Sequence, residues 1–161
     1  MDIIVDGYNL IGNDHGLRRD LEQRRNWLVQ RLSLYQEMKG HRVVVVFDGW
    51  KSGWLDEVSE TKQGLRIVFS RQGEKADSVI IRLAREKGSG SVVVTSDQEV
   101  RRSVERFGAV AIYSNEFSHR LRQLELVDAG DDEEQRRSNK KGNPSRLSKT
   151  ERKRLEKLKK L

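Results

Sequence analysis

Short apolar runs alternate along the chain with longer segments in which apolar residues recur at helical spacing. Val43 to Phe47 is an uninterrupted apolar run, which is typical of a parallel strand that other elements cover on both faces. Apolar residues between 17 and 38 recur every three or four positions with Arg and Gln between them, which predicts an amphipathic helix. The expected strands are 3–5, 43–47, 65–69, 91–97 and 109–113, and the expected helices lie in 17–38, 77–85, 98–107 and 115–124.

The order of these segments predicts an α/β fold. Strands that alternate with helices are joined by right-handed crossovers and form a mainly parallel sheet with helices on both faces. Residues 50–64 interrupt the pattern because they contain Trp50, Trp54 and several charges without a clean period, so we expect a loop there. The two tryptophans either anchor this loop or offer stacking platforms to bases.

Three of the expected strands end in an aspartate. Asp6 follows the first run directly, Asp48 follows the second, and Asp97 closes 91–97. The carboxyl ends of parallel strands share one edge of a sheet, and open α/β sheets bind their ligands there. We therefore expect these carboxylates to converge, and Asp77 to join them from the start of a helix near that edge. The simpler alternatives are a local turn at Asp6 and helix capping at Asp77.

Charge divides the chain into two parts. Of 161 residues, 35% are hydrophobic and 35% are charged, and the formal net charge is +7. Residues 128–161 hold 12 Lys/Arg against 7 Asp/Glu, a net of +5, which leaves +2 for residues 1–127. We expect a domain over 1–127 and a basic tail over 128–161, linker-like at first and helical near 148–161. Such a tail suggests a polyanionic partner, nucleic acid first, although it could instead serve solubility alone. An isolated helix of this length is marginal, so we expect it to order only on a partner such as RNA.

Several classes of protein are disfavoured by what the sequence lacks. Cysteine is absent, which excludes a disulfide framework and a Cys-based zinc site or nucleophile. No signal-peptide pattern and no apolar run approaching the ~20 residues of a membrane span is present. A cytoplasmic protein without membrane contact is the simplest interpretation.

Converging carboxylates would repel one another and raise their own pKa values unless a divalent cation neutralised them. Oxygen donors without cysteine suit Mg²⁺ or Mn²⁺, and such ions support phosphodiester hydrolysis. His15, His41 and His119 show no spacing typical of a histidine metal site. A phosphatase with an aspartyl nucleophile would carry a second aspartate where Tyr8 stands. A receiver domain would need paired acids near the first strand and a strand-end lysine, and we find neither.

The sequence contains a series of short motifs in a characteristic order. These motifs are Asp6-Gly-Tyr-Asn-Leu-Ile-Gly12, Val46-Phe-Asp-Gly49, Gly73-Glu-Lys-Ala-Asp77 and Thr95-Ser-Asp97. Together they resemble the NYN domain family, a branch of the PIN-like nucleases, and within it the bacterial YacP-like group, which includes a ribosome-associated endoribonuclease. The resemblance covers roughly residues 1–125, with the first and last motifs the most specific.

The resemblance implies a three-layer α/β/α PIN-like fold, metal-dependent RNA hydrolysis and contact with the ribosome. By matching position, the metal-binding and catalytic acids would be Asp6, Asp48, Asp77 and Asp97, with Asn9 and Ser96 in support and Glu74 as a less certain acid. Cations close in sequence to these acids, expected to hold the RNA backbone, are Arg71, Lys75 and Arg101. We therefore expect a Mg²⁺- or Mn²⁺-dependent endoribonuclease. The alternative is an RNA- or ribosome-binding module without catalysis, whose acidic site is vestigial.

Overall fold

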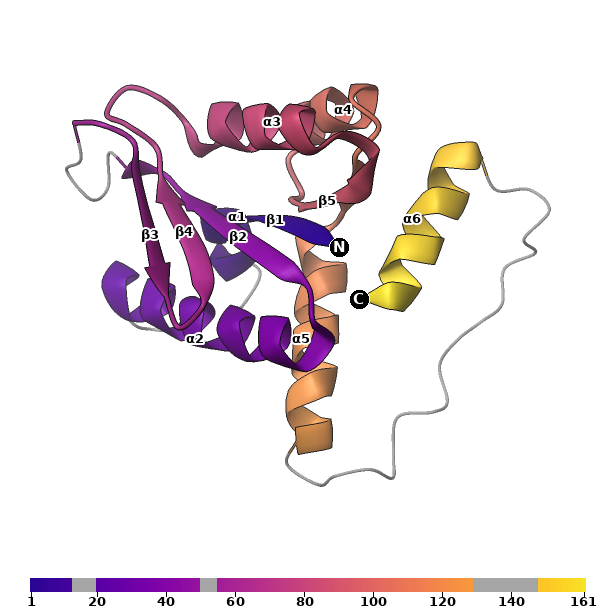
Figure 1. Cartoon of the computed structure of the whole chain (residues 1–161), viewed down its shortest axis with the longest axis horizontal. Helices are drawn as coiled ribbons and strands as arrows, with labels where there is room; N and C mark the ends of the chain where they lie inside the picture. The colour runs from indigo at the N-terminus through magenta and orange to yellow at the C-terminus, as the bar shows by residue number, and fades with distance from the viewer. Residues whose placement is uncertain (13–19, 50–54, 129–147) are drawn as a thin grey trace.

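A mainly parallel sheet runs through the middle of the protein (Figure 1). The computed structural model describes residues 1–12, 20–49, 55–128 and 148–161. Within these residues, six strands form one sheet in the order β3-β4-β2-β1-β5-β6, and every neighbouring pair is parallel except the antiparallel β3 and β4. The strands are β1 Asp2–Asp6, β2 Arg42–Phe47, β3 Val58–Lys62, β4 Leu65–Phe69, β5 Ser91–Val94 and β6 Val110–Ile112.

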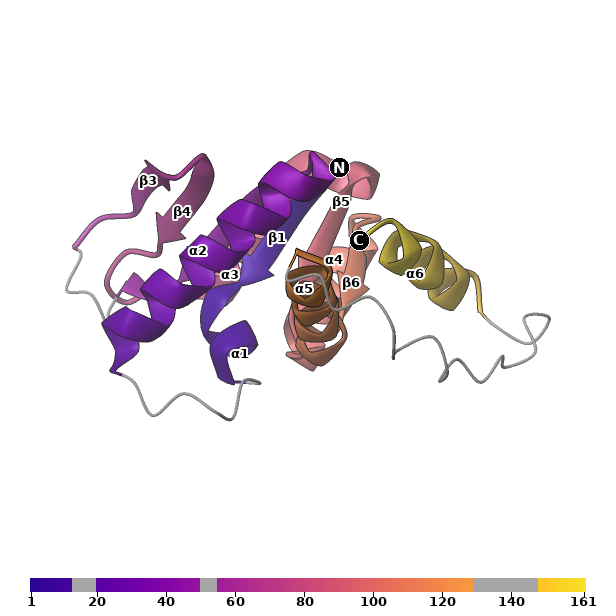
Figure 2. The same ribbon diagram turned by 90° about the horizontal axis from the view of Figure 1, so that it is seen from below.

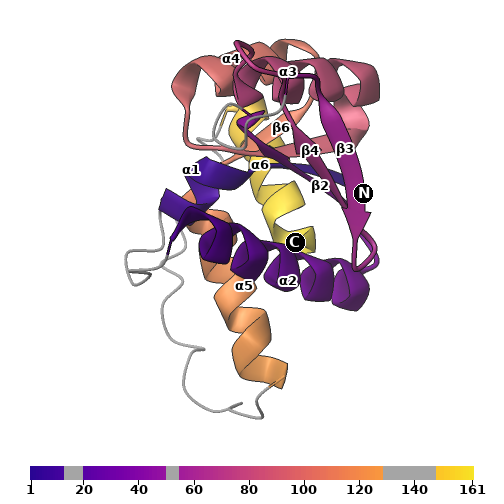
Figure 3. The same cartoon turned by 90° about the vertical axis from the view of Figure 1, so that its left-hand side faces the viewer.

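Helices cover both faces of this sheet, which confirms the predicted α/β architecture. The helices are α1 Gly7–Gly12, α2 Leu21–Lys39, α3 Ala76–Lys87, α4 Gln98–Arg106, α5 Ser114–Asp128 and α6 Lys149–Lys160, with a 3₁₀ turn at Gly88–Gly90. Helices α1, α2 and α5 pack on one face, and α3 and α4 on the other (Figures 2 and 3).

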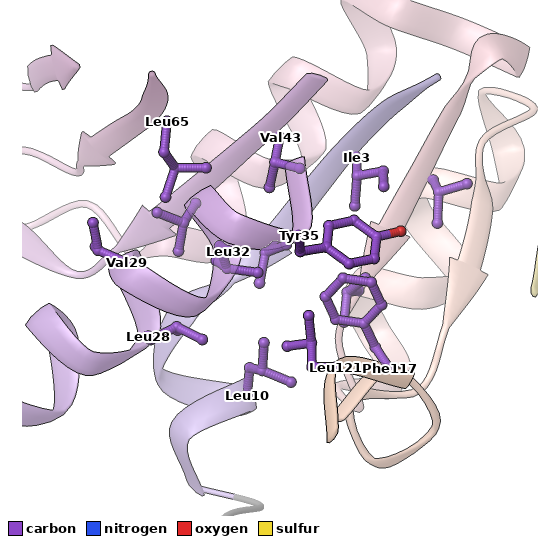
Figure 4. Close-up of a cluster of buried hydrophobic side chains, with 14 of the residues drawn as sticks. Ile3, Leu10, Leu28, Val29, Leu32, Tyr35, Val43, Leu65, Phe117 and Leu121 are labelled. Atoms are coloured by element: carbon purple, nitrogen blue, oxygen red, sulfur yellow. The ribbon is translucent and has the colours of Figure 1, made fainter. Parts of the chain in front are cut away.

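The alternation of side chains along each strand divides the apolar core into two clusters. In β1, Ile3 and Val5 point to the cluster shared with α2 and α5, whereas Ile4 points to the cluster under α3 and α4. All three side chains are fully buried. In the first cluster, the rings of Tyr35 and Phe117 meet edge to face with centroids 5.2 Å apart (Figure 4). Burial on both faces explains why the central strands are continuous apolar runs.

The second half of the expected loop at 50–64 is instead a strand. Strand β3 pairs with β4 through a turn at Gln63 and Gly64, which have φ values of 53° and 77°. Two consecutive residues with positive φ are typical of the tight hairpin turns that match strand twist. The prediction was wrong because β3 is almost entirely exposed along its length, so it has no buried face to produce an alternating pattern. Trp50, Trp54 and His15 lie outside the described residues.

The helix expected near the C-terminus is present and packs on the rest of the domain. Ser148 and Glu151 form a reciprocal capping box at its start, and α6 lies beside the edge strand β6 (Figure 2). Leu161 is buried in the core and Leu158 packs against it. Burying a leucine side chain contributes about 1.5–3 kcal/mol, which offsets the cost of ordering a short helix. The expectation that this helix orders only on a partner is therefore not met. None of the described helices is both long and apolar enough to span a membrane.

Candidate functional site

The register of the sheet brings the strand-end acids to one edge. Strands β2, β1 and β5 are neighbours, and Asp6 at the end of β1 lies opposite Val46 of β2. Asp48 comes two residues further along β2's path, and Asp97 follows β5 and caps α4. The parallel pairing thus places these aspartates at the carboxyl edge, as the sequence predicted. We call Asp6, Asp48, Asp97 and the nearby Asp77 the acidic edge.

Asp6 is the most enclosed member of the acidic edge. Only 7% of the surface of Asp6 is exposed to solvent. One carboxylate oxygen accepts a hydrogen bond from the backbone N–H of Asn9 at 3.2 Å, and the other accepts one from the hydroxyl of Thr95 at 3.0 Å. Thr95 is well placed for this contact because Val5 and Val94 are paired in the sheet, so the next residue on each strand lies at the same level. The carboxylate is therefore fixed in orientation from both sides.

Asn9 joins three segments of the chain at this edge. Its side-chain oxygen accepts hydrogen bonds from the backbone N–H of Ser96 at 3.0 Å and from the hydroxyl of Ser114 at 2.6 Å. The hydroxyl of Ser96 in turn accepts a hydrogen bond from the backbone N–H of Ser114 at 3.2 Å. Asn9 and Ser96 thus hold the ends of β1, β5 and β6 together, and they act on the site by positioning its backbone.

Asp48 connects the edge to the start of α3. Its carboxylate accepts a hydrogen bond from the backbone N–H of Ala76 at 2.7 Å, and the neighbouring Gly49 N–H donates to the hydroxyl of Ser70 at 3.0 Å. A Cβ on Gly49 would lie 1.6 Å from the carbonyl oxygen of Ser70, so a side chain cannot be accommodated there. The hydrogen bond from Ala76 to Asp48 keeps the first turn of α3, with Asp77, beside the end of β2.

The acids of this edge are close enough for their charges to affect one another's pKa values. The pKa of Asp6 is raised to about 6: burial is the largest cause, the charges of Asp77 and Asp48 add to the increase, and the hydrogen bonds from Asn9 and Thr95 oppose it. The pKa of Asp77 is raised by burial first and then by Asp97 and Asp48, while Lys75 opposes the increase. A set of acids that raise one another's pKa values favours a compensating cation.

The donor set fits a hard divalent cation held partly through water. In the described part of the chain, no three His, Asp or Glu side chains form a group that could hold a metal ion by themselves. Mg²⁺ commonly takes only one or two protein carboxylates and keeps several waters. A site without three carboxylates in direct contact with the ion is therefore compatible with Mg²⁺. The caps made by Asp48 and Asp97 use their Oδ1 atoms, which leaves Oδ2 of each outside these bonds.

The expected cations near the acidic edge differ in their surroundings. Arg71 is 66% exposed and pairs with Glu74 at 3.4 Å, so Glu74 is engaged by a cation beside the site. Lys75 is exposed and lowers the pKa of Asp77 through its charge. Both side chains are accessible to an RNA backbone.

Arg101 is not accessible in this way, which corrects its predicted role. The residue is 6% exposed, and its guanidinium donates to the backbone carbonyls of Thr95 and Ala111 at 3.3 and 3.4 Å. It also lies 3.6 Å from the centroid of the Tyr113 ring. A guanidinium used inside the fold cannot also hold a phosphate, so Arg101 supports the ends of β5 and β6 instead.

Sequence reasoning missed several polar residues that complete the edge. Thr95, which contacts Asp6, directly follows β5. Ser114, which contacts Asn9, lies two residues after the end of β6. Their positions after apolar strands were the signal in the sequence that could have identified them. Tyr8 accepts a hydrogen bond from Arg25 at 3.4 Å through its hydroxyl, while its ring packs on Phe47. The contact from α2 to Tyr8 had no signal in the sequence because it joins residues 17 positions apart.

Comparison with known proteins identifies the family. The profile of the YacP-like NYN domain matches residues 3–160. The chain belongs to this family. YacP of Bacillus subtilis strain 168 is 32% identical over 136 residues, which cover 80% of this chain and 78% of that protein.

Solved structures of a YacP-like NYN domain agree with this assignment. The crystal structure of Rae1 (YacP) from Bacillus subtilis has a TM-score of 0.66 at 27% identity, covering 81% of this chain and 79% of that one. Its W164L mutant has the same TM-score at 26% identity, covering 82% and 85%. The fold is therefore PIN-like, and the NYN domain is nuclease-like. The match to the profile extends beyond the 1–125 range of the motifs and includes α6.

Proposed function

We propose that the protein is a metal-dependent endoribonuclease that hydrolyses RNA phosphodiester bonds. The observation that carries this proposal is the position of Asp6, a nearly buried carboxylate at the carboxyl edge that faces other acids and that no cation among the described residues neutralises. Membership of a nuclease-like family supports the same conclusion, since divalent metals are general among such domains.

The residues of the acidic edge would act as the ligands of the metal ion. Asp6, Asp48, Asp77 and Asp97 would hold Mg²⁺ or Mn²⁺. Such an ion, when bound, supplies an activated water and neutralises charge on the phosphate and leaving oxygen.

The remaining polar residues would position this set and its substrate. Thr95 fixes the orientation of Asp6 through its hydroxyl. Asn9 keeps the loop after β1 attached to the ends of β5 and β6. Lys75 and Arg71, both accessible beside Asp77 and Glu74, would attract the RNA backbone toward the acids. An in-line geometry depends on this positioning, because small displacements of reacting atoms cost large factors in rate.

The test is cleavage of mixed-sequence RNA by the full chain with Mn²⁺, with EDTA, and by the variant Asp6→Asn. Wild type should cleave the RNA in Mn²⁺ but not in EDTA, and Asp6→Asn should not cleave it in either condition. Asp56→Asn, which makes the same change at an exposed acid outside the site, should retain wild-type activity. Cleavage that persists in EDTA or in Asp6→Asn would reject the assignment.

A second candidate is a module that binds RNA or the ribosome without catalysis. It is favoured by one observation: within the described residues, no three acids stand close enough to hold a metal by themselves. On this hypothesis, Mn²⁺ would neither stabilise the protein nor support cleavage. Ribosome-associated mRNA in the cytoplasm is the substrate that we propose for the enzyme, on family resemblance, and co-sedimentation with ribosomes tests it.

A further inference from the structure

Helix α6 presents a line of lysines on one side. Lys149, Lys153, Lys157 and Lys160 follow one another at intervals of four, four and three residues, which places them on a single face of an α-helix. Lys157 is partly buried and the other three are exposed. We call these residues the lysine stripe. None of the described acids forms an ion pair with it, and α6 as a whole carries seven Lys/Arg against two Glu.

Two leucines fix the C-terminal end of α6 against the domain. Leu158 and Leu161 pack in the core with α2 and β6. The hydroxyl of Tyr35 donates to the carbonyl of Leu161 at 3.5 Å, and a ring nitrogen of His41 lies 3.1 Å from the carbonyl of Lys160. His41 immediately precedes β2, so this end of α6 lies at the amino edge of the sheet, away from the acids.

The middle of α6 is attached near the other edge. The guanidinium of Arg154 pairs with Glu116 at 3.5 Å and lies 5.5 Å from the centroid of the Tyr113 ring. Tyr113 directly follows β6 at the carboxyl edge, and its neighbour Ser114 donates to Asn9 of the acidic edge. Helix α6 therefore crosses beside β6 with its middle attached near the carboxyl edge and its last residues at the amino edge, and its first turn stands farthest from the sheet (Figures 1 and 2).

We infer that the lysine stripe binds the sugar-phosphate backbone of single-stranded RNA and leads the strand to the acidic edge. The inference rests on the proposed function for the identity of the substrate. At 1.5 Å per residue the stripe is about 16 Å long, enough to meet several phosphates. Lys149 and Lys153, which precede Arg154, are the exposed members of the stripe in the first half of the helix.

Docking of α6 adds a physical reason for this role. The leucines and Arg154 already hold the helix in place, so RNA does not need to order it. A binding surface that is formed in advance avoids the entropy cost of coupled folding. The stripe is thus a rigid guide for the substrate, in contrast to a tail that folds on RNA.

The test measures RNA binding separately from cleavage. The full chain is titrated against fluorescein-labelled single-stranded RNA in EDTA, by fluorescence anisotropy, between 50 and 400 mM KCl. The stripe variant is Lys149→Gln with Lys153→Gln. The matched control is Lys39→Gln with Arg106→Gln, which removes the same charge from exposed residues in the last turns of α2 and α4. Circular dichroism and thermal unfolding verify that each variant is folded.

The two double variants should separate clearly. Each lysine that neutralises one phosphate of a single strand contributes about 0.7 to the salt slope, so the stripe variant should lose about 1.4 from the slope. At 0.1 M salt this corresponds to an affinity about twentyfold weaker, while the control stays within about twofold of wild type. Equal losses in both variants, unchanged affinity in the stripe variant, or no binding by wild type would each overturn the inference. If wild type binds through the stripe but does not cleave with Mn²⁺, the proposed nuclease activity fails and the RNA guide stands.

Discussion

The two ends of strand β1 carry the same residue in opposite surroundings. Asp2, at the amino edge, pairs with Lys87 at 2.9 Å and with Arg42 at 2.8 Å. Asp6, at the carboxyl edge, faces Asp77 and Asp48 instead. Burial raises the pKa of Asp2, but Lys87 and Arg42 more than offset it, so that this pKa lies below its ordinary value. Burial and neighbouring acids leave the pKa of Asp6 at about 6.

This difference separates a carboxylate that stabilises the fold from one that the fold retains at a cost. An acid whose folded pKa is raised favours unfolding at neutral pH, whereas an acid whose pKa is lowered favours folding. Asp2 and Asp6 lie four residues apart on one strand. The protein neutralises Asp2 with its own cations, whereas Asp6 would need a cation from solution. The predictions below test whether the two aspartates differ in this way.

The largest expected effect concerns metal binding. Mn²⁺ at a thousand times its Kd should stabilise the wild-type protein by about 4 kcal/mol through mass action. Asp6→Asn should lose most of this gain because it removes the most enclosed of the proposed metal ligands, while Asp2→Asn should keep it. Urea unfolding with and without Mn²⁺ measures the difference. Equal gains in the two variants would show that any metal site lies elsewhere.

The second effect is the pH dependence of stability without metal. Asp6 has an ordinary pKa of 3.8 and a folded pKa of about 6, so the folded state binds the extra proton between these values. Its contribution is fully present below about pH 4 and is lost as pH rises through 6, by at most about 3 kcal/mol. Urea unfolding in EDTA from pH 4 to 7 should show this loss in wild type relative to Asp6→Asn. Parallel curves for the two proteins would contradict it.

The third effect tests the support that β5 gives to Asp6. Thr95→Val removes the hydroxyl that donates to Asp6 at 3.0 Å and preserves the shape of the side chain. Loss of a hydrogen bond behind a metal ligand typically costs tenfold to a hundredfold in metal affinity, about 1.4–2.7 kcal/mol. Thermal shift against Mn²⁺ concentration gives the affinity, and Thr61→Val on the exposed strand β3 is the control. A Kd within twofold of wild type would remove Thr95 from the site.

The contrast between the edges also shows what the sequence could predict. The convergence of Asp6, Asp48 and Asp97 could be predicted because each lies at or shortly after the end of a buried strand, and neighbouring parallel strands end at one edge. Those predictions needed only hydrophobic pattern and chain direction.

Other features depend on contacts that local pattern does not carry. Arg101 lies next to the apolar face of α4 and is buried because Tyr113 and two backbone carbonyls receive its guanidinium. The docking of α6 needs Tyr35 and His41, more than a hundred residues earlier in the chain. Composition described the charge of the segment around α6 correctly but gave no information about the surface on which it packs.

The smallest expected effect belongs to Asp2. Asp2→Asn removes the carboxylate charge between Lys87 and Arg42, whose side chains are 30% and 79% exposed. Such partly solvated pairs contribute up to about 1 kcal/mol, so the variant should be destabilised by that amount at pH 7. Because the folded pKa of Asp2 is lowered, its contribution is present above the unfolded pKa and disappears as pH falls through the folded one. Wild type and Asp2→Asn should therefore converge in stability at acid pH, opposite to the trend for Asp6. A destabilisation that grows as pH falls would mean that Asp2 acts through packing and not through its charge.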